Sequence, residues 1–301
     1  MSIDKLNEEF ALENQLLFVA GNGDFPFVHI NHNQARAVIS VYGGQVLSYH
    51  PLTEAKDVLF LSHQAYYQEG KAIKGGVPVC WPWFGADPQG LGRPAHGFVR
   101  NRMWSVIETK TTAIGEPQLS LGLADSSETR AIWPYPFNLT LTITLGKTLR
   151  LALTTRNTGD QAFPLTQALH TYFSVGDITK TSVAGLDGTQ YVDKAANAKS
   201  GLHTQKGEVT ITEEVDRIYT DVPAKVSISD KAQKRHIHLT STGSHSMVVW
   251  NPWQDIAASM ADLKDDDYLR LLCVETTNAA PDVVDVSPGE EHCMAVEFRV
   301  A

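Results

Sequence analysis

The chain has 301 residues, of which 43% are hydrophobic and 20% charged, as is typical of a soluble globular protein with a large core. Its formal net charge of −9 disfavours nucleic acid and anionic membranes as partners. Three widely spaced cysteines without a CxxC pair argue against a disulfide framework and against a zinc–cysteine site. Neither an apolar membrane span nor a signal-like N-terminal stretch is present in the sequence, so we expect a cytosolic protein.

The apolar spacing near the N-terminus predicts one short helix within residues 1–17, in an extension that runs to residue 20. Short alternating runs rich in Val, Ile, Leu and Thr follow, and most end at Gly, Asn, Asp or Pro. No long linker, repeat or low-complexity segment divides the chain. We therefore expect residues 1–301 to form a single all-β domain, a sandwich with a few short helices.

Two of these runs predict a β-hairpin. Residues 137–146 (FNLTLTITLG) and 148–157 (TLRLALTTRN) flank Gly146 and Lys147. In the first run, Leu and Ile occupy one set of alternate positions and Thr the other. One face of that sheet should therefore be apolar.

Residues 71–104 are dense in Gly, Pro and Trp and lack a strand pattern. Their aromatic side chains favour an ordered loop, of a kind suited to a sugar pocket. Five potentially basic side chains lie in this loop: Lys74, Arg93, His96, Arg100 and Arg102. In an acidic chain they indicate either an anionic ligand or a loop pinned by salt bridges.

Two titratable residues interrupt apolar segments. His170 lies in LTQALHTYFSVGDI, and Glu275 closes the apolar run of YLRLLCVETTNAAP. Each could be structural, as a hydrogen-bonded core histidine or a glutamate paired with an arginine. Alternatively, a partly desolvated carboxylate at a strand end could act as a base near neutral pH. His236 and His238 share a strand face but have no third ligand of suggestive spacing, so we expect no metal site.

Seven stretches together resemble the aldose 1-epimerase superfamily, and within it the glucose-6-phosphate 1-epimerase branch. They are GGQVLSY (43–49), IKGGVPVCWPWFG (73–85), PAHGFVRNRMW (94–104), ALHTYFSVGDI (168–178), EEVDRIY (213–219), VVWNPW (248–253) and CVETTN (273–278). They occur in the family's order from about residue 40 to 280. The resemblance implies a galactose-mutarotase-like fold, a large twisted β-sandwich with the active site in a cleft on its concave face.

The resemblance also implies roles for individual residues. The His of ALHTYF is His170 and the acid of CVETTN is Glu275, which correspond to the family's acid/base pair. We expect Glu275 to act as the general base at the C1 hydroxyl and His170 as the general acid at the ring oxygen, with the roles reversed on ring closure.

The family's phosphate and sugar contacts fall on Lys74, Arg100 and Asp216, and His96 is expected to line the pocket or to brace the loop. Lys74 stands where many relatives carry Arg, which keeps the charge but loses the two-pronged hydrogen bonding. Asp216 suits sugar hydroxyls, or else forms a salt bridge with Arg217 or Arg100. The tryptophans of these motifs (Trp81, Trp83 and Trp250) are expected to pack rather than to contact a ligand.

The resulting prediction is an isomerase that interconverts the α and β anomers of a hexose 6-phosphate, with glucose 6-phosphate as the first candidate. The chemistry requires neither a metal nor an organic cofactor. We expect a monomer whose partner is a small sugar phosphate. The alternatives are an epimerase of free hexoses and a non-catalytic carbohydrate-binding β-sandwich.

Overall fold

The computed structural model describes residues 2–301, and strands dominate it. The strands form sheets of nine, eight, four and two strands, and every paired strand runs antiparallel to its neighbour. The helices are short: α1 (Ile3–Phe10), α2 (Ser127–Ile132), α3 (Trp253–Ser259) and the single 3₁₀ turns η1 (Asn22–Asp24), η2 (Val99–Asn101), η3 (Ile178–Lys180) and η4 (Asp267–Leu269). The predicted all-β fold with few short helices is confirmed. Among the helices of residues 2–301, none has the length and apolar character needed to span a bilayer.

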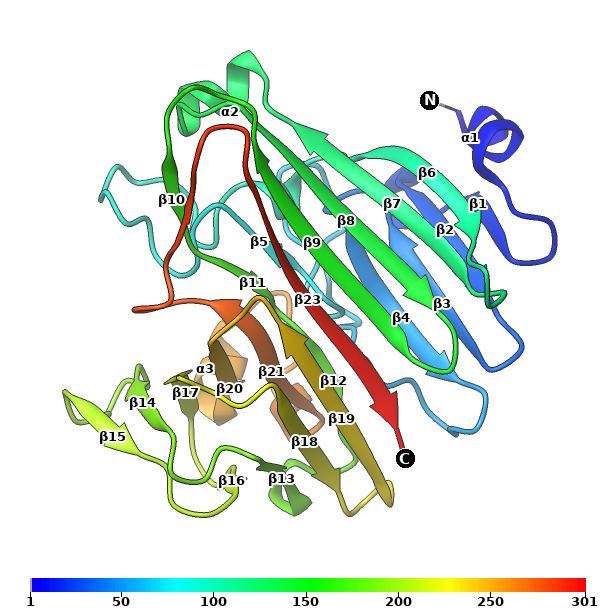
Figure 1. Cartoon of the computed structure of the whole chain (residues 1–301). Coiled ribbons are helices and arrows are strands. Elements are labelled where there is room, and N and C mark those ends of the chain that lie inside the picture. Colours follow the sequence, from blue (N-terminus) through cyan, green and yellow to red (C-terminus); the bar gives the residue numbers. More distant parts are fainter. Residues whose placement is uncertain (1) are drawn as a thin grey trace.

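The nine-stranded sheet forms one layer of the molecule (Figure 1). Its strands, in spatial order, are β16 (Val209–Thr210), β13 (Thr181–Ala184), β18 (Lys225–Asp230), β19 (Arg235–Thr242), β23 (Glu291–Val300), β9 (Leu149–Asn157), β8 (Phe137–Leu145), β7 (Pro117–Ala124) and β6 (Ser105–Thr111).

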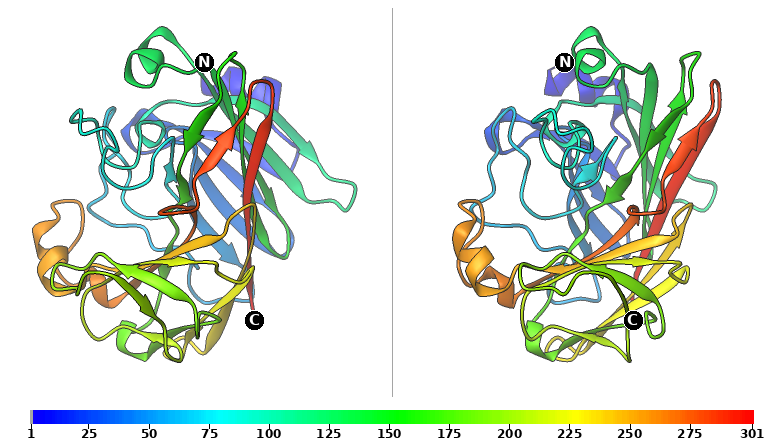
Figure 2. Two further views of the ribbon diagram at one scale, coloured as in Figure 1. Left: turned by 60° about the vertical axis from the view of Figure 1, so that its left-hand side comes forward. Right: turned by 90° about the vertical axis from the view of Figure 1, so that its left-hand side faces the viewer.

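The second layer consists of two sheets (Figures 1 and 2). The four-stranded sheet, blue in both figures, contains β1 (Leu16–Ala20), β2 (Pro26–Asn31), β3 (Ala35–Ser40) and β4 (Gln45–Pro51). The eight-stranded sheet runs in the order β15 (Leu202–Thr204), β14 (Gln190–Asp193), β17 (Val215–Thr220), β20 (Ser246–Asn251), β21 (Leu271–Asn278), β11 (Gln167–Leu169) and β5 (Val79–Cys80), with β12 (Tyr172–Ser174) also paired to β21. The remaining pair is β10 (Phe163–Leu165) with β22 (Val284–Val286).

One hydrophobic core holds these layers together. It contains buried side chains from the four-stranded sheet (Ile39), the nine-stranded sheet (Leu141, Phe298) and the eight-stranded sheet (Val249, Val274). Because side chains alternate along a strand, the neighbours Val248 and Glu275 point to the opposite face of the eight-stranded sheet. That outward face carries the site described below.

The predicted hairpin is present as β8 and β9, with Leu145 paired to Leu149. The Leu and Ile positions of β8 are buried and the Thr positions are partly exposed, as the alternating pattern requires. The predicted N-terminal helix is shorter than expected. It spans Ile3–Phe10, and Leu16–Ala20 is already a strand of the four-stranded sheet, with Leu16 and Phe18 buried in the hydrophobic core. Residue 1 of the predicted range lies outside the described residues.

Candidate active site

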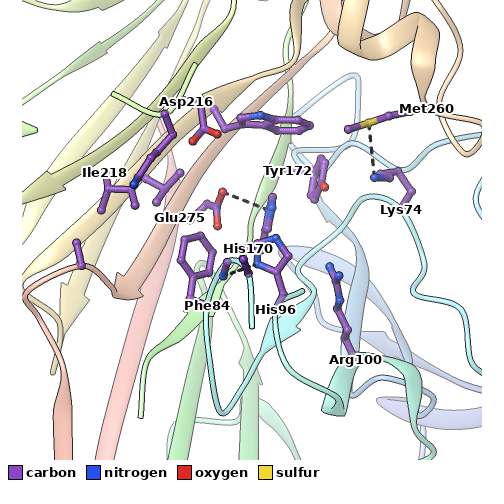
Figure 3. A pocket seen from close by; sticks show the side chains of 16 residues that line it. Lys74, Phe84, His96, Arg100, His170, Tyr172, Asp216, Ile218, Met260 and Glu275 are labelled. Atoms are coloured by element: carbon purple, nitrogen blue, oxygen red, sulfur yellow. Dashed lines mark hydrogen bonds and ion pairs between the residues drawn. The ribbon is translucent and has the colours of Figure 1, made fainter. Parts of the chain in front are cut away.

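A cavity of about 600 Å³ opens on the outward face of the eight-stranded sheet (Figure 3). Sheet residues line one side and the loop of residues 71–104 lines the other. All six residues singled out from the sequence lie in its lining: Lys74, His96, Arg100, His170, Asp216 and Glu275.

Strand register explains how residues so distant in sequence meet. Val248 pairs with Glu275, and Ile218 pairs with Val248. In the next row, Asp216 pairs with Trp250, Trp250 with Cys273, and Cys273 with Tyr172. Residues two apart on a strand share a face, so both rows present their side chains to the cavity side of the sheet.

His170 occupies a two-residue break between β11 and β12. Leu169 pairs with Thr276 and Tyr172 pairs with Cys273, so His170 and Thr171 lie opposite the segment that contains Glu275. The register therefore brings the imidazole to the carboxylate.

The two side chains are close and almost fully buried. His170 Nδ1 lies 3.4 Å from Glu275 Oε1, and the residues are only 8% and 1% exposed. Neither His170 Nδ1 nor Glu275 Oε2 has a hydrogen-bond partner within residues 2–301. The ring of Tyr172 stacks on the imidazole at 4.8 Å, and the Trp250 ring meets it edge-on at 6.1 Å. A rigid aromatic frame thus fixes the imidazole beside the carboxyl group.

Burial moves the pKa values of this pair in opposite directions. Loss of solvent lowers the pKa of His170 well below its ordinary value, and the nearby His96, Arg100 and Lys74 lower it further. Loss of solvent raises the pKa of Glu275 well above its ordinary value, and the carboxylate of Asp216 raises it further while Arg100 opposes the shift. Burial therefore favours the uncharged form of each group.

Asp216 lies across the cavity from Lys74 and Arg100 (Figure 3). Burial, followed by the Glu214 and Asp193 carboxylates, raises the pKa of Asp216 to about 6. The expected alternative partner, Arg217, binds Asp193 instead at 3.3 Å, and Arg100 donates to the carbonyl of Ala95 at 3.0 Å. Within residues 2–301, Asp216 forms no ion pair, and its oxygens face the cavity.

Replacing Asp216 by Asn should alter the titration of the neighbouring pair. Removing a negative charge makes ionisation of Glu275 easier, so its pKa should fall. The alkaline limb of the pH profile of kcat/KM should move to lower pH, by on the order of one unit. Steady-state rates measured from pH 5 to 10 test this, with the exposed Glu213→Gln as control. An unshifted limb would remove Asp216 from the electrostatics of the pair.

Backbone pairing within the loop positions its basic residues. The Ser62 N–H donates to the Lys74 carbonyl at 3.1 Å, and the His96 N–H donates to Gly85 at 2.7 Å. His96 also accepts a hydrogen bond on Nδ1 from the Gly85 N–H at 3.3 Å. Burial, Arg100 and Lys74 lower the pKa of His96 to about 3, so the ring is neutral and carries its hydrogen on Nε2. His96 both lines the pocket and braces the loop.

Gly97 allows the two arms of this loop to touch. Its φ is +73°, and a Cβ atom there would lie 1.8 Å from the Trp81 carbonyl oxygen. Gly97→Ala should lower the free energy of unfolding by at least about 2 kcal/mol and displace His96. Denaturant titration measures this loss. Gly90→Ala is the matched control, because Gly90 has φ +66° but no atom near a new Cβ. Equal losses in both variants would mean that backbone conformation alone, without the close approach, sets the cost.

Similarity to known proteins shows the family to which the chain belongs. The aldose 1-epimerase family model matches residues 26–299. A protein of Escherichia coli K12, named provisionally as a glucose-6-phosphate 1-epimerase, is 38% identical over 278 residues, covering 92% of this chain and 91% of its own. The chain belongs to the aldose 1-epimerase family.

Solved structures agree with this assignment. A crystal structure from Salmonella typhimurium, provisionally described as a mutarotase, superposes with a TM-score of 0.88 at 33% identity and covers 99% of both chains. A galactose mutarotase-like protein from Clostridium acetobutylicum shares the fold, with a TM-score of 0.74 at 15% identity over 98% of this chain and 99% of its own. The expected resemblance and the galactose-mutarotase-like fold are confirmed, and the protein is an isomerase that acts on carbohydrates.

In this aldose 1-epimerase the basic loop residues divide into two groups. Lys74, His96 and Arg100 line the cavity. Arg93 instead binds Asp87 and stacks on Trp83, and Arg102 binds Glu128 at 3.2 Å. The salt-bridge interpretation therefore holds for Arg93 and Arg102, and an anionic ligand stays a prediction for the three cavity residues.

One expectation needs correction. Glu275 does not close its strand, because β21 continues to Asn278 through buried polar residues, and the carboxyl group is fully rather than partly buried. Trp81 and Trp83 are buried, as expected, and Trp250 packs edge-on against His170 and Tyr172 while it also lines the cavity. Its burial differs because its neighbours along β20 face the core while it faces outward.

Several residues of the site escaped the sequence argument. Phe84, Ile218 and Met260 add apolar walls, Tyr172 stacks on His170, and Lys194 contributes a cation at the rim. Tyr172 and Phe84 lie inside the matching motifs and could have been found there. Met260 and Lys194 lie outside them, and only the fold brings them to the cavity.

One group of donors within residues 2–301 could hold a metal ion. Nitrogen, sulfur and oxygen atoms of His170, Cys273 and Glu275 lie within 4.8 Å of one another. Donors that share a tetrahedral zinc ion are separated by about 3.3–3.8 Å, so these atoms would have to close up. Burial also raises the pKa of the Cys273 thiol well above its ordinary value, which disfavours the thiolate that zinc requires.

Proposed function

We propose that the protein interconverts the α and β anomers of a hexose 6-phosphate, with glucose 6-phosphate as the first substrate to test. The buried His170–Glu275 pair, facing a cavity that also holds Lys74 and Arg100, carries this proposal. A proton-transfer pair suits anomer exchange, and two cations suit a phosphate. The E. coli and Salmonella relatives bear names consistent with the same reaction.

The proposed reaction proceeds from the form of the pair in which the shared proton lies on His170, so that the ionised Glu275 can accept the proton of the C1 hydroxyl. The C1–O5 bond breaks as His170 donates a proton to O5, which leaves an open-chain aldehyde and reverses the protonation of the pair. Rotation about C1–C2 presents the other face of the carbonyl. Closure returns both protons to their starting groups and yields the other anomer.

One proton shared between the two groups is sufficient for this cycle. The opposite pKa shifts favour a pair that keeps a single proton over a broad range around neutral pH. Below that range the pair binds a second proton, on His170, so no base remains. Above it Glu275 loses the last proton, so no acid remains. The pH profile should therefore be a wide bell whose limbs belong to the pair.

The remaining lining residues suit the other parts of a sugar phosphate. Lys74 and Arg100 lie together on one side of the pair and Asp216 on the other (Figure 3). We assign the phosphate to the two cations, since charge-assisted bonds would position the ring between acid and base. We assign Asp216 and the Nε2–H of His96 to hydrogen bonds with the sugar hydroxyls.

Saturation-transfer NMR on glucose 6-phosphate and on glucose tests the proposal. We expect the protein to exchange the anomers of the phosphate ester much faster than buffer does, and faster than those of glucose at equal concentration. Equal rates on both sugars would favour an epimerase of free hexoses. Binding of either sugar without faster exchange would favour a carbohydrate-binding module.

A further inference from the structure

Lys74 has an internal partner that the proposed reaction does not use. Its Nζ lies 3.4 Å from Asp262 Oδ1, and the two side chains are only 17% and 21% exposed. Lys74 lines the main cavity and also a neighbouring cavity of about 240 Å³, whereas Asp262 lines only the second. The lysine therefore stands between a substrate site and a carboxylate of its own chain.

The contact between these two residues is loose. Charge-assisted hydrogen bonds from an ammonium group to a carboxylate are usually about 2.7–2.9 Å long. Lys180 and Asp177 of this chain approach to 2.8 Å. Lys74 instead stays at 3.4 Å from Asp262, and its hydrogen-bond acceptor is the thioether sulfur of Met260 at 3.8 Å, which accepts weakly. The ammonium group thus keeps strong donor capacity for another anion.

The turn that carries Asp262 is anchored to the body of the protein. Asp262 lies in the turn after α3, where the Leu263 N–H donates to the Met260 carbonyl at 3.2 Å. Leu263 is buried against Phe60 and Tyr172, which anchors the turn. Lys74 has a flexible four-carbon stem, so the lysine is the partner that can move.

We propose that Asp262 is a specificity-determining residue that competes with the substrate's phosphate for Lys74. This inference rests on the proposed function. Without an anion in the main cavity, Lys74 leans toward Asp262, and a bound phosphate draws it away at the expense of that contact. A lysine suits this exchange, because its compact charge on a flexible stem can swing between two acceptors.

Asp262→Asn tests the competition. The variant should bind inorganic phosphate more tightly in calorimetry, and its KM for glucose 6-phosphate should fall, each by roughly fivefold. The KM for glucose should stay unchanged. Asp265→Asn is the matched control, since Asp265 is exposed in the same connection between α3 and η4 and its loss changes the net charge equally. A similar gain in Asp265→Asn would indicate general charge and overturn the proposal.

A double-mutant comparison isolates the lysine. In a Lys74→Ala background, Asp262→Asn should no longer change phosphate affinity. The proposal would be overturned if the gain persisted in that background or if Asp262→Asn gave no gain in the wild-type background. Weaker phosphate binding in Asp262→Asn would also overturn it, because Asp262 would then support Lys74 and not compete for it. Asp262→Ala provides a second variant in case the amide of Asp262→Asn packs badly.

The two proposals can fail separately. Wild-type protein that binds phosphate but does not exchange the anomers of a sugar phosphate would contradict the proposed function, while the calorimetry would still decide the role of Asp262.

Discussion

Glu275→Gln is expected to lower kcat for anomer exchange by about 10²–10⁴-fold while KM changes little. The amide keeps the shape of the side chain and cannot take the proton of the C1 hydroxyl. His170→Ala should cause a loss of similar size, because the ring oxygen then lacks its proton donor. Saturation transfer at saturating glucose 6-phosphate measures both rates.

The control for this result lies on the opposite layer of the molecule. His238 is an exposed histidine on β19, and His238→Ala should retain full activity. The double variant of His170 and Glu275 should be little worse than either single variant, because the two groups act as one unit. Losses that multiply would mean that the groups act independently, and near-normal kcat in Glu275→Gln would exclude it as the base.

Arg100→Ala should raise the KM for glucose 6-phosphate by roughly 10- to 100-fold. Arg100 is a cavity cation that pairs with no carboxylate in the described part of the chain, residues 2–301, so its charge is available to a phosphate. Free glucose carries no such group, and its KM should scarcely change. Steady-state exchange rates on the two sugars give the comparison.

Arg102→Ala is the matched control for Arg100→Ala. Arg102 lies two residues along the same loop but binds Glu128 on the surface. Its loss should affect neither sugar. If Arg100→Ala weakens both sugars equally, the guanidinium shapes the pocket generally and does not bind the phosphate.

The sequence predicted the fold where side-chain alternation was regular. The hairpin of β8 and β9 follows from strict alternation, which only a sheet with one buried face satisfies. The N-terminal segment was harder, because Leu17 extends the helical spacing of the apolar residues before it, whereas Leu16 and Phe18 alternate as in a strand. Only their burial against the core decides between the two.

Site residues could be predicted only where motifs carried them. His170 and Glu275 were found this way, but the burial of Glu275 was underestimated because Thr276, Thr277 and Asn278 read as the polar end of a strand. In the fold these residues are buried and bonded to Ser241, Ser246 and Gln167. The contact of Lys74 with Asp262 joins positions with no local pattern to link them, so it needed the folded chain.

The cavity draws its two halves from different parts of the architecture. Glu275 lies on β21 and His170 in the short break between β11 and β12, which both pair with β21, so their separation is set by sheet register. Lys74 and Arg100 lie on an irregular loop that the sheet only supports. Loops tolerate changes in length and sequence far better than central strands do. Grafting loops from relatives onto this scaffold would therefore be a direct way to retune which sugar is accepted while the proton-transfer chemistry is inherited intact.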